Sequence, residues 1–195
     1  MDFDLSDDQV ALVDGLRSML GGRFDRPCVR SMIDAGLHRS RWRELGDTGV
    51  FSMTVAVADG GVGLGWVEAA LTFEELGRSL VPGPLVATTL AATLRPALAD
   101  GGTVVGLVEA SGGALVVEHW PALDQLILVD AEAIWLIDDL EAIPATVEPR
   151  PLDPLTPVAR IESLPAGQQI GDARDSLMLR RRGALLTSAL QLGLA

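Results

Sequence analysis

Apolar residues recur every three or four positions through the first hundred residues, which is the spacing of helices that bury one face. In the first of these helices, Ser6 and Gln9 have the spacing of a capping box, and Gly21-Gly22 predicts the end. Four more helices are predicted: after Asp25, from Ser40 to Gly46 or Gly49, from Trp66 to Leu80, and over residues 85–98. The chain is therefore expected to begin with a helical region.

A glycine-rich segment separates the third and fourth of these helices. The apolar run before it, "VFSMTVAVA" at 50–58, could form a strand, so that strand, glycine turn and helix would outline a dinucleotide site. The fingerprint of such sites is G-x-G-x-x-G, because the backbone must approach a pyrophosphate closely. Here Gly61, Gly63 and Gly65 give G-x-G-x-G, and Trp66 occupies the place of the third glycine. We therefore interpret the segment as a tight turn.

After residue 100 the apolar spacing changes from helical to extended. Short β-branched runs are separated by glycine, proline and aspartate, which is typical of antiparallel strands. The runs are "TVVGLVEA" (103–110), "ALVVEHW" (114–120), "QLILVD" (125–130), "AIWLID" (133–138), "ATVEPRP" (145–151) and "VARIESL" (158–164). Helical spacing returns at Ala173. We predict a helical region over 1–100, a β region over 101–172, and the start of a second helical region over 173–195.

Composition and charge narrow the class of protein. The 195 residues are 48% hydrophobic, which is enough for a sizeable core. The net charge of −12 opposes nucleic-acid binding, since that affinity comes mainly from basic side chains. No apolar run approaches the roughly 20 residues needed to span a bilayer, and the acidic start lacks the basic flank of a signal peptide. We expect a soluble cytoplasmic protein with neither nucleic acid nor membrane as a partner.

Isolated cysteine and histidine residues give little support for a catalytic or metal site. Cys28 is the single cysteine, which excludes an internal disulfide and favours core packing over a nucleophilic role. His38 and His119 have no cysteine or carboxylate partners at ligand spacing. The residues alone therefore predict no metal site.

Clustered charges are likewise interpreted as surface features. Glu74 and Glu75 would point about 100° apart on a helix, so we expect a solvated face rather than an acid–base pair. Asp138-Asp139 is interpreted as a hairpin turn. Residues 180–182 are three arginines, interpreted as a solvated helix face that could also meet an anionic ligand or an acidic partner. No catalytic, cofactor-binding or metal-binding residue is assigned.

Four stretches together resemble the acyl-CoA dehydrogenase family. They are "MDFDLSDDQVALVDGLRSML" (1–20), "RWRELGDTGVFSMTVAVADGGVGLGWVEAALTFEELGRSLVPGP" (41–84), "PLDPLTPVARIESLPAG" (151–167) and the segment from Ala173. The resemblance covers nearly the whole chain, and its most specific part is the run over 59–84. It implies an α+β fold: an N-terminal all-α domain, a small antiparallel β domain, and the first helix of a C-terminal helical domain of which the chain holds only the start.

The resemblance also implies an activity. It is the FAD-dependent α,β-dehydrogenation of an acyl-CoA thioester in lipid or steroid catabolism, in which a glutamate removes the α proton and the β hydrogen leaves as hydride to flavin N5. That glutamate lies in the family's C-terminal domain, so no residue here is given its role. The resemblance further implies a homo- or hetero-oligomer with related subunits.

The β region departs from the family pattern around the flavin. Within "GLVEASGGA" (106–114), Glu109 persists, but Val108 and Ala110 occupy the positions of a threonine and a proline. Trp120 and Trp135 stand in contexts unlike that of the family's flavin-stacking tryptophan. Leu155 and Thr156 replace a threonine and an arginine of many relatives. Two alternatives stay open: a flavin-poor, non-catalytic structural subunit of a heteromeric acyl-CoA dehydrogenase, and an unrelated ligand-binding module.

Overall fold

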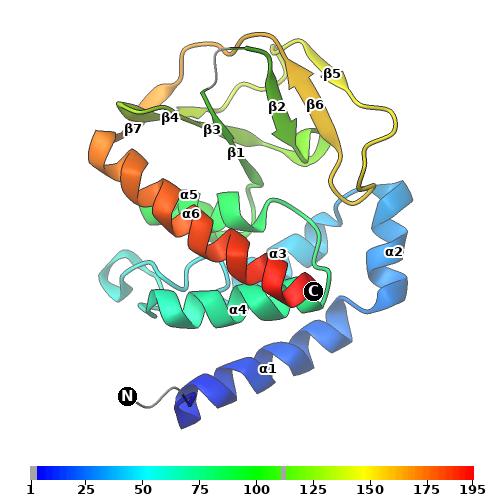
Figure 1. Cartoon of the computed structure of the whole chain (residues 1–195), viewed down its shortest axis with the longest axis vertical. Coiled ribbons are helices and arrows are strands. Elements are labelled where there is room, and N and C mark those ends of the chain that lie inside the picture. Colours follow the sequence, from blue (N-terminus) through cyan, green and yellow to red (C-terminus); the bar gives the residue numbers. More distant parts are fainter. Residues whose placement is uncertain (1–3, 111–112) are drawn as a thin grey trace.

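The computed structural model of the chain describes residues 4–110 and 113–195. Figure 1 shows helices α1 to α4 on one side of the molecule and the strands on the other, with α5 and α6 between them. The helices are α1 (Asp7–Arg23), α2 (Arg26–Ala35), α3 (Arg39–Asp47), α4 (Trp66–Arg78), α5 (Leu85–Leu94) and α6 (Ala173–Leu194). Short 3₁₀ helices span Val57–Asp59, Pro96–Asp100 and Trp120–Ala122.

Side-chain caps fix the beginnings of the first two helices. The Ser6 hydroxyl accepts a hydrogen bond from the Gln9 amide, and the Gln9 side chain accepts one from the Ser6 amide, which confirms the predicted capping box. The Asp25 carboxylate accepts a hydrogen bond from the Cys28 amide at 2.9 Å and so caps α2. Both beginnings agree with the sequence pattern.

Other helix boundaries differ by a few residues from the predictions. α1 continues through Gly21-Gly22, because Leu20 and Phe24 are buried on either side of the glycine pair and hold the last turn. α3 begins one residue before Ser40 and has no side-chain cap. α5 stops short of residue 98, since Pro96 disfavours helix in the residue before it.

The predicted strand at 50–58 does not form. Phe51 and Met53 are buried, but the segment folds into successive turns that pair with no described strand. The glycine segment closes onto these turns: the Gly63 amide donates to the Val55 carbonyl at 2.9 Å, and the Leu64 amide donates to the Met53 carbonyl at 2.7 Å. Because the protein itself uses these amides, the glycine segment is a tight turn, as interpreted from its spacing.

The strands form two sheets. The four-stranded sheet has the order β1 (Val105–Glu109), β3 (Gln125–Val129), β4 (Ala133–Ile137), β7 (Gln168–Asp172). The three-stranded sheet has the order β2 (Leu115–Glu118), β6 (Val158–Ile161), β5 (Ala145–Val147). All six predicted runs contain a strand, and the α+β fold class is confirmed.

Two details of the sheets differ from the sequence-based expectation. β1 pairs with β3 in parallel, because the chain leaves the first sheet to form β2 in the other sheet and then returns. The other described pairs are antiparallel. β7 was not predicted, because Gln168 and Gln169 give it no apolar alternation and it lies at the edge of the sheet.

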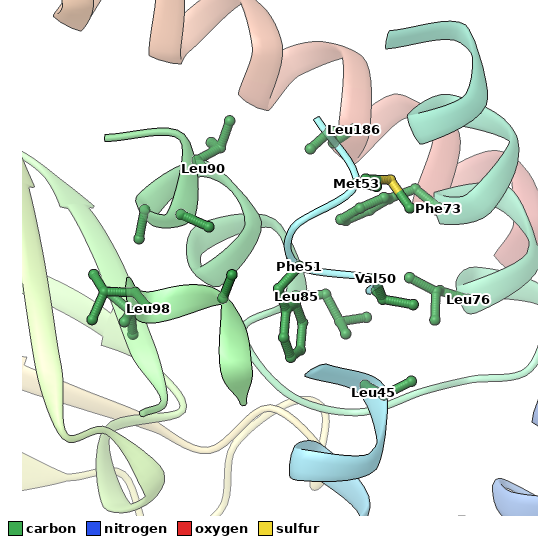
Figure 2. Close-up of a cluster of buried hydrophobic side chains, with 14 of the residues drawn as sticks. Leu45, Val50, Phe51, Met53, Phe73, Leu76, Leu85, Leu90, Leu98 and Leu186 are labelled. Atoms are coloured by element: carbon green, nitrogen blue, oxygen red, sulfur yellow. The ribbon is translucent and has the colours of Figure 1, made fainter. Parts of the chain in front are cut away.

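The larger hydrophobic core joins the helices to one face of the four-stranded sheet. Figure 2 shows part of this core, with Phe51, Phe73, Leu90 and Leu186 among its labelled side chains. A second core lies in the β region and consists of Val108, Leu115, Val117, Leu126, Ile137, Ile143 and Ile161. Since α6 contributes Leu186 to the larger core, its packing is integral to the helical region.

α4 and α6 approach each other closely through two glycines. A Cβ on Gly77 would lie 2.1 Å from the Leu190 carbonyl oxygen, and one on Gly193 would lie 1.9 Å from the Glu74 carbonyl oxygen. The two backbones are therefore in direct contact, and this contact sets the position of α6 beside α5 and β1.

Among the residues that the structure describes, no helix combines the length and the apolar character needed to cross a bilayer.

Candidate functional site

A cleft of about 890 Å³ opens between α5, β1, α6 and the α4–α5 connection. This volume lies in the range of small-molecule sites. Most of its walls are apolar or small residues: Leu80, Val81, Pro82, Gly83, Leu85, Val86, Leu90, Gly106, Leu107, Leu155, Leu179, Gly183, Ala184, Leu190 and Leu194. The cleft is therefore suited to a largely hydrocarbon group.

One ion pair crosses the cleft from β1 to α6. Arg180 Nε lies 3.4 Å from Glu109 Oε1, with the Glu109 side chain 59% exposed and that of Arg180 33% exposed. A pair this exposed contributes little to stability, because water screens it. The position of the ion pair matters more than its energy. Glu109, at the end of β1, holds Arg180, which is the only cationic side chain among the described residues that line the cleft.

The charge balance of the cleft disfavours a pyrophosphate. Three carboxylates, Glu109, Glu118 and Asp153, line it against the one paired guanidinium of Arg180. The first turn of α5 adds only the partial positive charge of a helix N-terminus. FAD carries a doubly charged pyrophosphate, so the described residues fit an apolar ring or acyl chain but do not fit the whole of that cofactor.

His119 is the buried titratable group of the site. The residue is 8% exposed, lines the cleft and has a φ of 57°, a backbone region in which histidine is among the better-tolerated residues. Burial lowers the pKa of His119 to about 4, against a smaller opposing effect of the Asp153 carboxylate, so the imidazole is neutral at pH 7. Sequence spacing gave this residue no role, because its neighbours in the cleft come from distant segments.

The alternation of β1 places Val108 away from the cleft. Leu107 and Glu109 line the cleft, whereas Val108 is 7% exposed and packs in the second core with Leu115 and Leu126. A hydroxyl at position 108 would therefore lie in the β core. The absence of a threonine there consequently removes no hydrogen bond from the cleft.

Of the other residues that depart from the family pattern, two line the cleft and two tryptophans lie in the β region. Leu155 and Thr156 line the cleft. Trp135 lies on β4, where its indole nitrogen donates to the Asp130 carboxylate at 3.1 Å, and Trp120 packs against the second core. The residue pair 111–112 of the "GLVEASGGA" run lies outside the described residues.

Glu75 is not on a solvated face. It is 2% exposed, and its two carboxylate oxygens accept hydrogen bonds from Arg17 of α1 at 2.9 Å each. Glu74 pairs with Arg78 instead, at 2.6 Å. The solvated-face interpretation is wrong for Glu75, because α1 packs over α4 at this point. The ion pair between Arg17 and Glu75 therefore holds α1 against α4.

Two other charged clusters also differ from the expectation. Asp138-Asp139 links β4 to β5, which lie in different sheets, so it is no hairpin turn. The β3–β4 turn instead follows Asp130, whose carboxylate accepts the amides of Glu132 and Ala133. The three arginines at 180–182 diverge: Arg180 meets Glu109, and Arg182 lies 4.7 Å from the centre of the Trp66 ring.

No metal centre is found within the described ranges, where no three histidine, cysteine, aspartate or glutamate residues are grouped to hold an ion. Cys28 is a half-buried free thiol on α2.

Comparison with known proteins gives consistent matches. Residues 6–104 match the family model described as acyl-CoA dehydrogenase, N-terminal domain. The chain is 28% identical over 205 aligned positions to acyl-CoA dehydrogenase IpdE2 of Mycolicibacterium smegmatis, covering 98% of this chain and 62% of the relative. It is 39% identical over 89 residues to IpdE2 of Mycobacterium tuberculosis, covering 44% of this chain and 28% of that relative. The chain thus spans less than two thirds of either relative.

Solved structures share the fold. The ChsE4–ChsE5 complex of Mycobacterium tuberculosis superposes with a TM-score of 0.78 at 19% identity, over 99% of this chain and 65% of the matched chain. A glutaryl-CoA dehydrogenase of Mycobacterium smegmatis in complex with FADH2 gives a TM-score of 0.74 at 16% identity, over 97% of this chain and 62% of that one.

Proposed function

Because the chain belongs to the acyl-CoA dehydrogenase family, we propose that it forms the acyl-binding side of a site for the α,β-dehydrogenation of an acyl-CoA thioester. The observation that carries this proposal is the cleft of about 890 Å³ with mainly apolar walls. Each methylene group that such a wall removes from water stabilises the complex by about 0.8 kcal/mol. The acyl chain is therefore the part of the thioester that this cleft suits.

The residues of the cleft would bind and orient the acyl group. The leucines of α5, β1 and α6 exclude water from it, and the Glu109–Arg180 pair ties β1 to α6 across the cleft. Members of the family use FAD as the electron acceptor. Since the charges here do not fit its pyrophosphate, we propose that residues outside this cleft hold that part of the cofactor, and no residue of this chain is given a step in hydride transfer.

A second candidate follows from the same charge balance. With three carboxylates against one paired arginine, the chain would serve as a flavin-poor, non-catalytic subunit that supports a related catalytic subunit. The ChsE4–ChsE5 complex, in which two named proteins associate, supports a hetero-oligomer of this kind. Either role leaves the acyl-binding cleft as the feature to test.

A side chain that fills part of the cleft should weaken acyl binding. Thr187 lies on α6 and lines the cleft, whereas Leu185 lies on the same helix, is 41% exposed and does not line it. We expect Thr187→Trp to weaken octanoyl-CoA binding by about tenfold or more, since the indole takes space that several methylene groups need. Leu185→Trp is the matched control and should leave binding unchanged. The measurement is isothermal titration calorimetry of the full-length protein, with any subunit that co-purifies.

Free coenzyme A separates the acyl contribution from that of the nucleotide. The proposal requires octanoyl-CoA to bind more tightly than coenzyme A to the wild-type protein. Equal affinities, or equal effects of the two tryptophan variants, would show that the cleft holds no acyl group.

A further inference from the structure

A second cavity, of about 370 Å³, lies next to the cleft. It is lined by the end of α2 and the residues that follow it, and by prolines 121, 154 and 157 of the β region. Four residues line both cavities: Pro82, Gly83, His119 and Leu155. The two spaces therefore adjoin at one junction.

The fold itself fixes the shape of this junction. Gly83 has a φ of 115°, which side chains rarely adopt, and a Cβ there would lie 2.5 Å from Cζ3 of Trp42. Trp42 is 1% exposed and stacks near Phe51 in the larger core, with ring centres 4.6 Å apart. Because a buried ring supports Gly83 from behind, the junction is set by the core of the molecule.

His119 is the polar side chain at the junction. The residue is more than nine-tenths buried, no described residue hydrogen-bonds its imidazole, and its ring nitrogens are not fully enclosed, so they remain open to the cavities. Buried polar groups in proteins nearly always have a hydrogen-bond partner. A neutral imidazole offers one donor and one acceptor, so a ligand atom at the junction could satisfy either.

The remaining walls of the second cavity are part apolar and part polar, and they include the carboxylate of Asp34. Met32, Ile33 and Leu37 line one side, and Arg39 is already engaged with Asp124 and the Ala122 carbonyl. A purely hydrocarbon ligand that filled both cavities would leave the imidazole buried without a partner. An oxygen on the ligand near His119 would remove that cost, so the junction selects for a polar atom at this point of the acyl group.

We propose that the two cavities together hold one acyl group that carries a keto or hydroxyl oxygen beyond its thioester, and that this oxygen hydrogen-bonds to His119. The inference rests on the proposed acyl-binding function and adds the substrate class. His119 is a specificity residue in this account and takes no part in the chemical step.

The test compares decanoyl-CoA with a series of oxodecanoyl-CoA isomers, each with one ketone at a different position. Affinities are measured by calorimetry on the full-length protein with any co-purifying subunit. At least one ketone position should bind about three- to tenfold more tightly than decanoyl-CoA, which is the usual net effect of one neutral hydrogen bond. If no position is preferred while decanoyl-CoA binds, the inference is overturned and the proposed function stands. If none of the thioesters binds, both are overturned.

Variants assign the preference to His119. His119→Phe should abolish the ketone preference, so that decanoyl-CoA and every oxodecanoyl-CoA isomer bind this variant with the same affinity. His119→Asn keeps a donor and an acceptor and tolerates the positive φ, so it should retain part of the preference. His38, the other histidine, lies outside both cavities, so His38→Phe should have no effect on the ketone preference. A preference that survives His119→Phe would overturn the inference.

Nuclear magnetic resonance provides a readout that needs no variant, in case His119→Phe does not fold. The chain has two histidines, so the imidazole nitrogen signals of His119 and His38 can be separated. The preferred oxodecanoyl-CoA should shift the His119 signals and leave those of His38 in place. Equal shifts with decanoyl-CoA would contradict a hydrogen bond to the ketone.

Discussion

At the scale of single residues, His119 is neutral in the folded protein at pH 7, because burial lowers its pKa to about 4 from an ordinary 6.5. The Asp153 carboxylate raises the pKa but does not offset the burial. Glu109 and Glu118 line the same cleft, and Arg39 lines the second cavity. The folded protein thus keeps an uncharged imidazole in a setting where acidic groups outnumber basic ones.

Acid should destabilise the fold through this residue. Between pH 6.5 and about 4 the unfolded chain binds a proton that the folded protein does not bind, so stability falls as the pH falls through this window. The loss attributable to His119 is up to about 3 kcal/mol by pH 4. The measurement is urea unfolding at several pH values for the wild type and His119→Asn, with His38→Asn as the control. Parallel pH profiles for the wild type and His119→Asn would contradict the low pKa.

Sequence reasoning could not find the roles of His119 or Glu75, for a common reason. The surroundings of His119 come from the α4–α5 connection and from residues near 155, and Glu75 is covered by Arg17, 58 positions away. Such environments depend on tertiary packing, which spacing along one helix or strand does not record. By contrast, the Ser6–Gln9 capping box is local and was predictable.

At the scale of elements, the position of α6 depends on its close approach to α4. Gly77 and Gly193 allow the two backbones to touch, and Leu179 and Leu186 of α6 then fill the larger core. Apolar spacing predicts the limits of both helices to within two residues, but it does not indicate which glycines mark a contact. Apolar spacing likewise does not predict that β1 and β3 pair in parallel, since this pairing arises because the intervening strand β2 belongs to the other sheet.

A methyl group at the helix contact should be costly. Gly77→Ala places Cβ 2.1 Å from the Leu190 carbonyl oxygen, so the helices must separate, and we expect a loss of about 1–3 kcal/mol in the free energy of unfolding. Gly15→Ala in α1 is the matched control, because nothing lies within 4 Å of its added Cβ, and it should stabilise by up to about 1 kcal/mol. Chemical denaturation measures both. Stabilisation by Gly77→Ala would mean that α6 does not lie against α4 as described.

At the scale of the whole molecule, an apolar cleft and an acidic charge balance occur together. The cleft suits an acyl chain, yet its three carboxylates and one paired arginine do not suit the pyrophosphate of FAD. The outer face of α6 also carries exposed leucines at 177, 185 and 192, which a further protein surface could cover. These features support the proposed role as a subunit that acts with a related chain.

The visible absorption spectrum of the purified protein tests this account most directly. It should be recorded for the protein expressed alone and for the protein co-expressed with the products of neighbouring genes. We expect no flavin absorption from the protein alone, because the charges of its cleft do not suit the pyrophosphate, and we expect flavin absorption from the complex with a related subunit. Stoichiometric flavin bound to the protein alone would contradict the account and would assign a complete cofactor site to this chain.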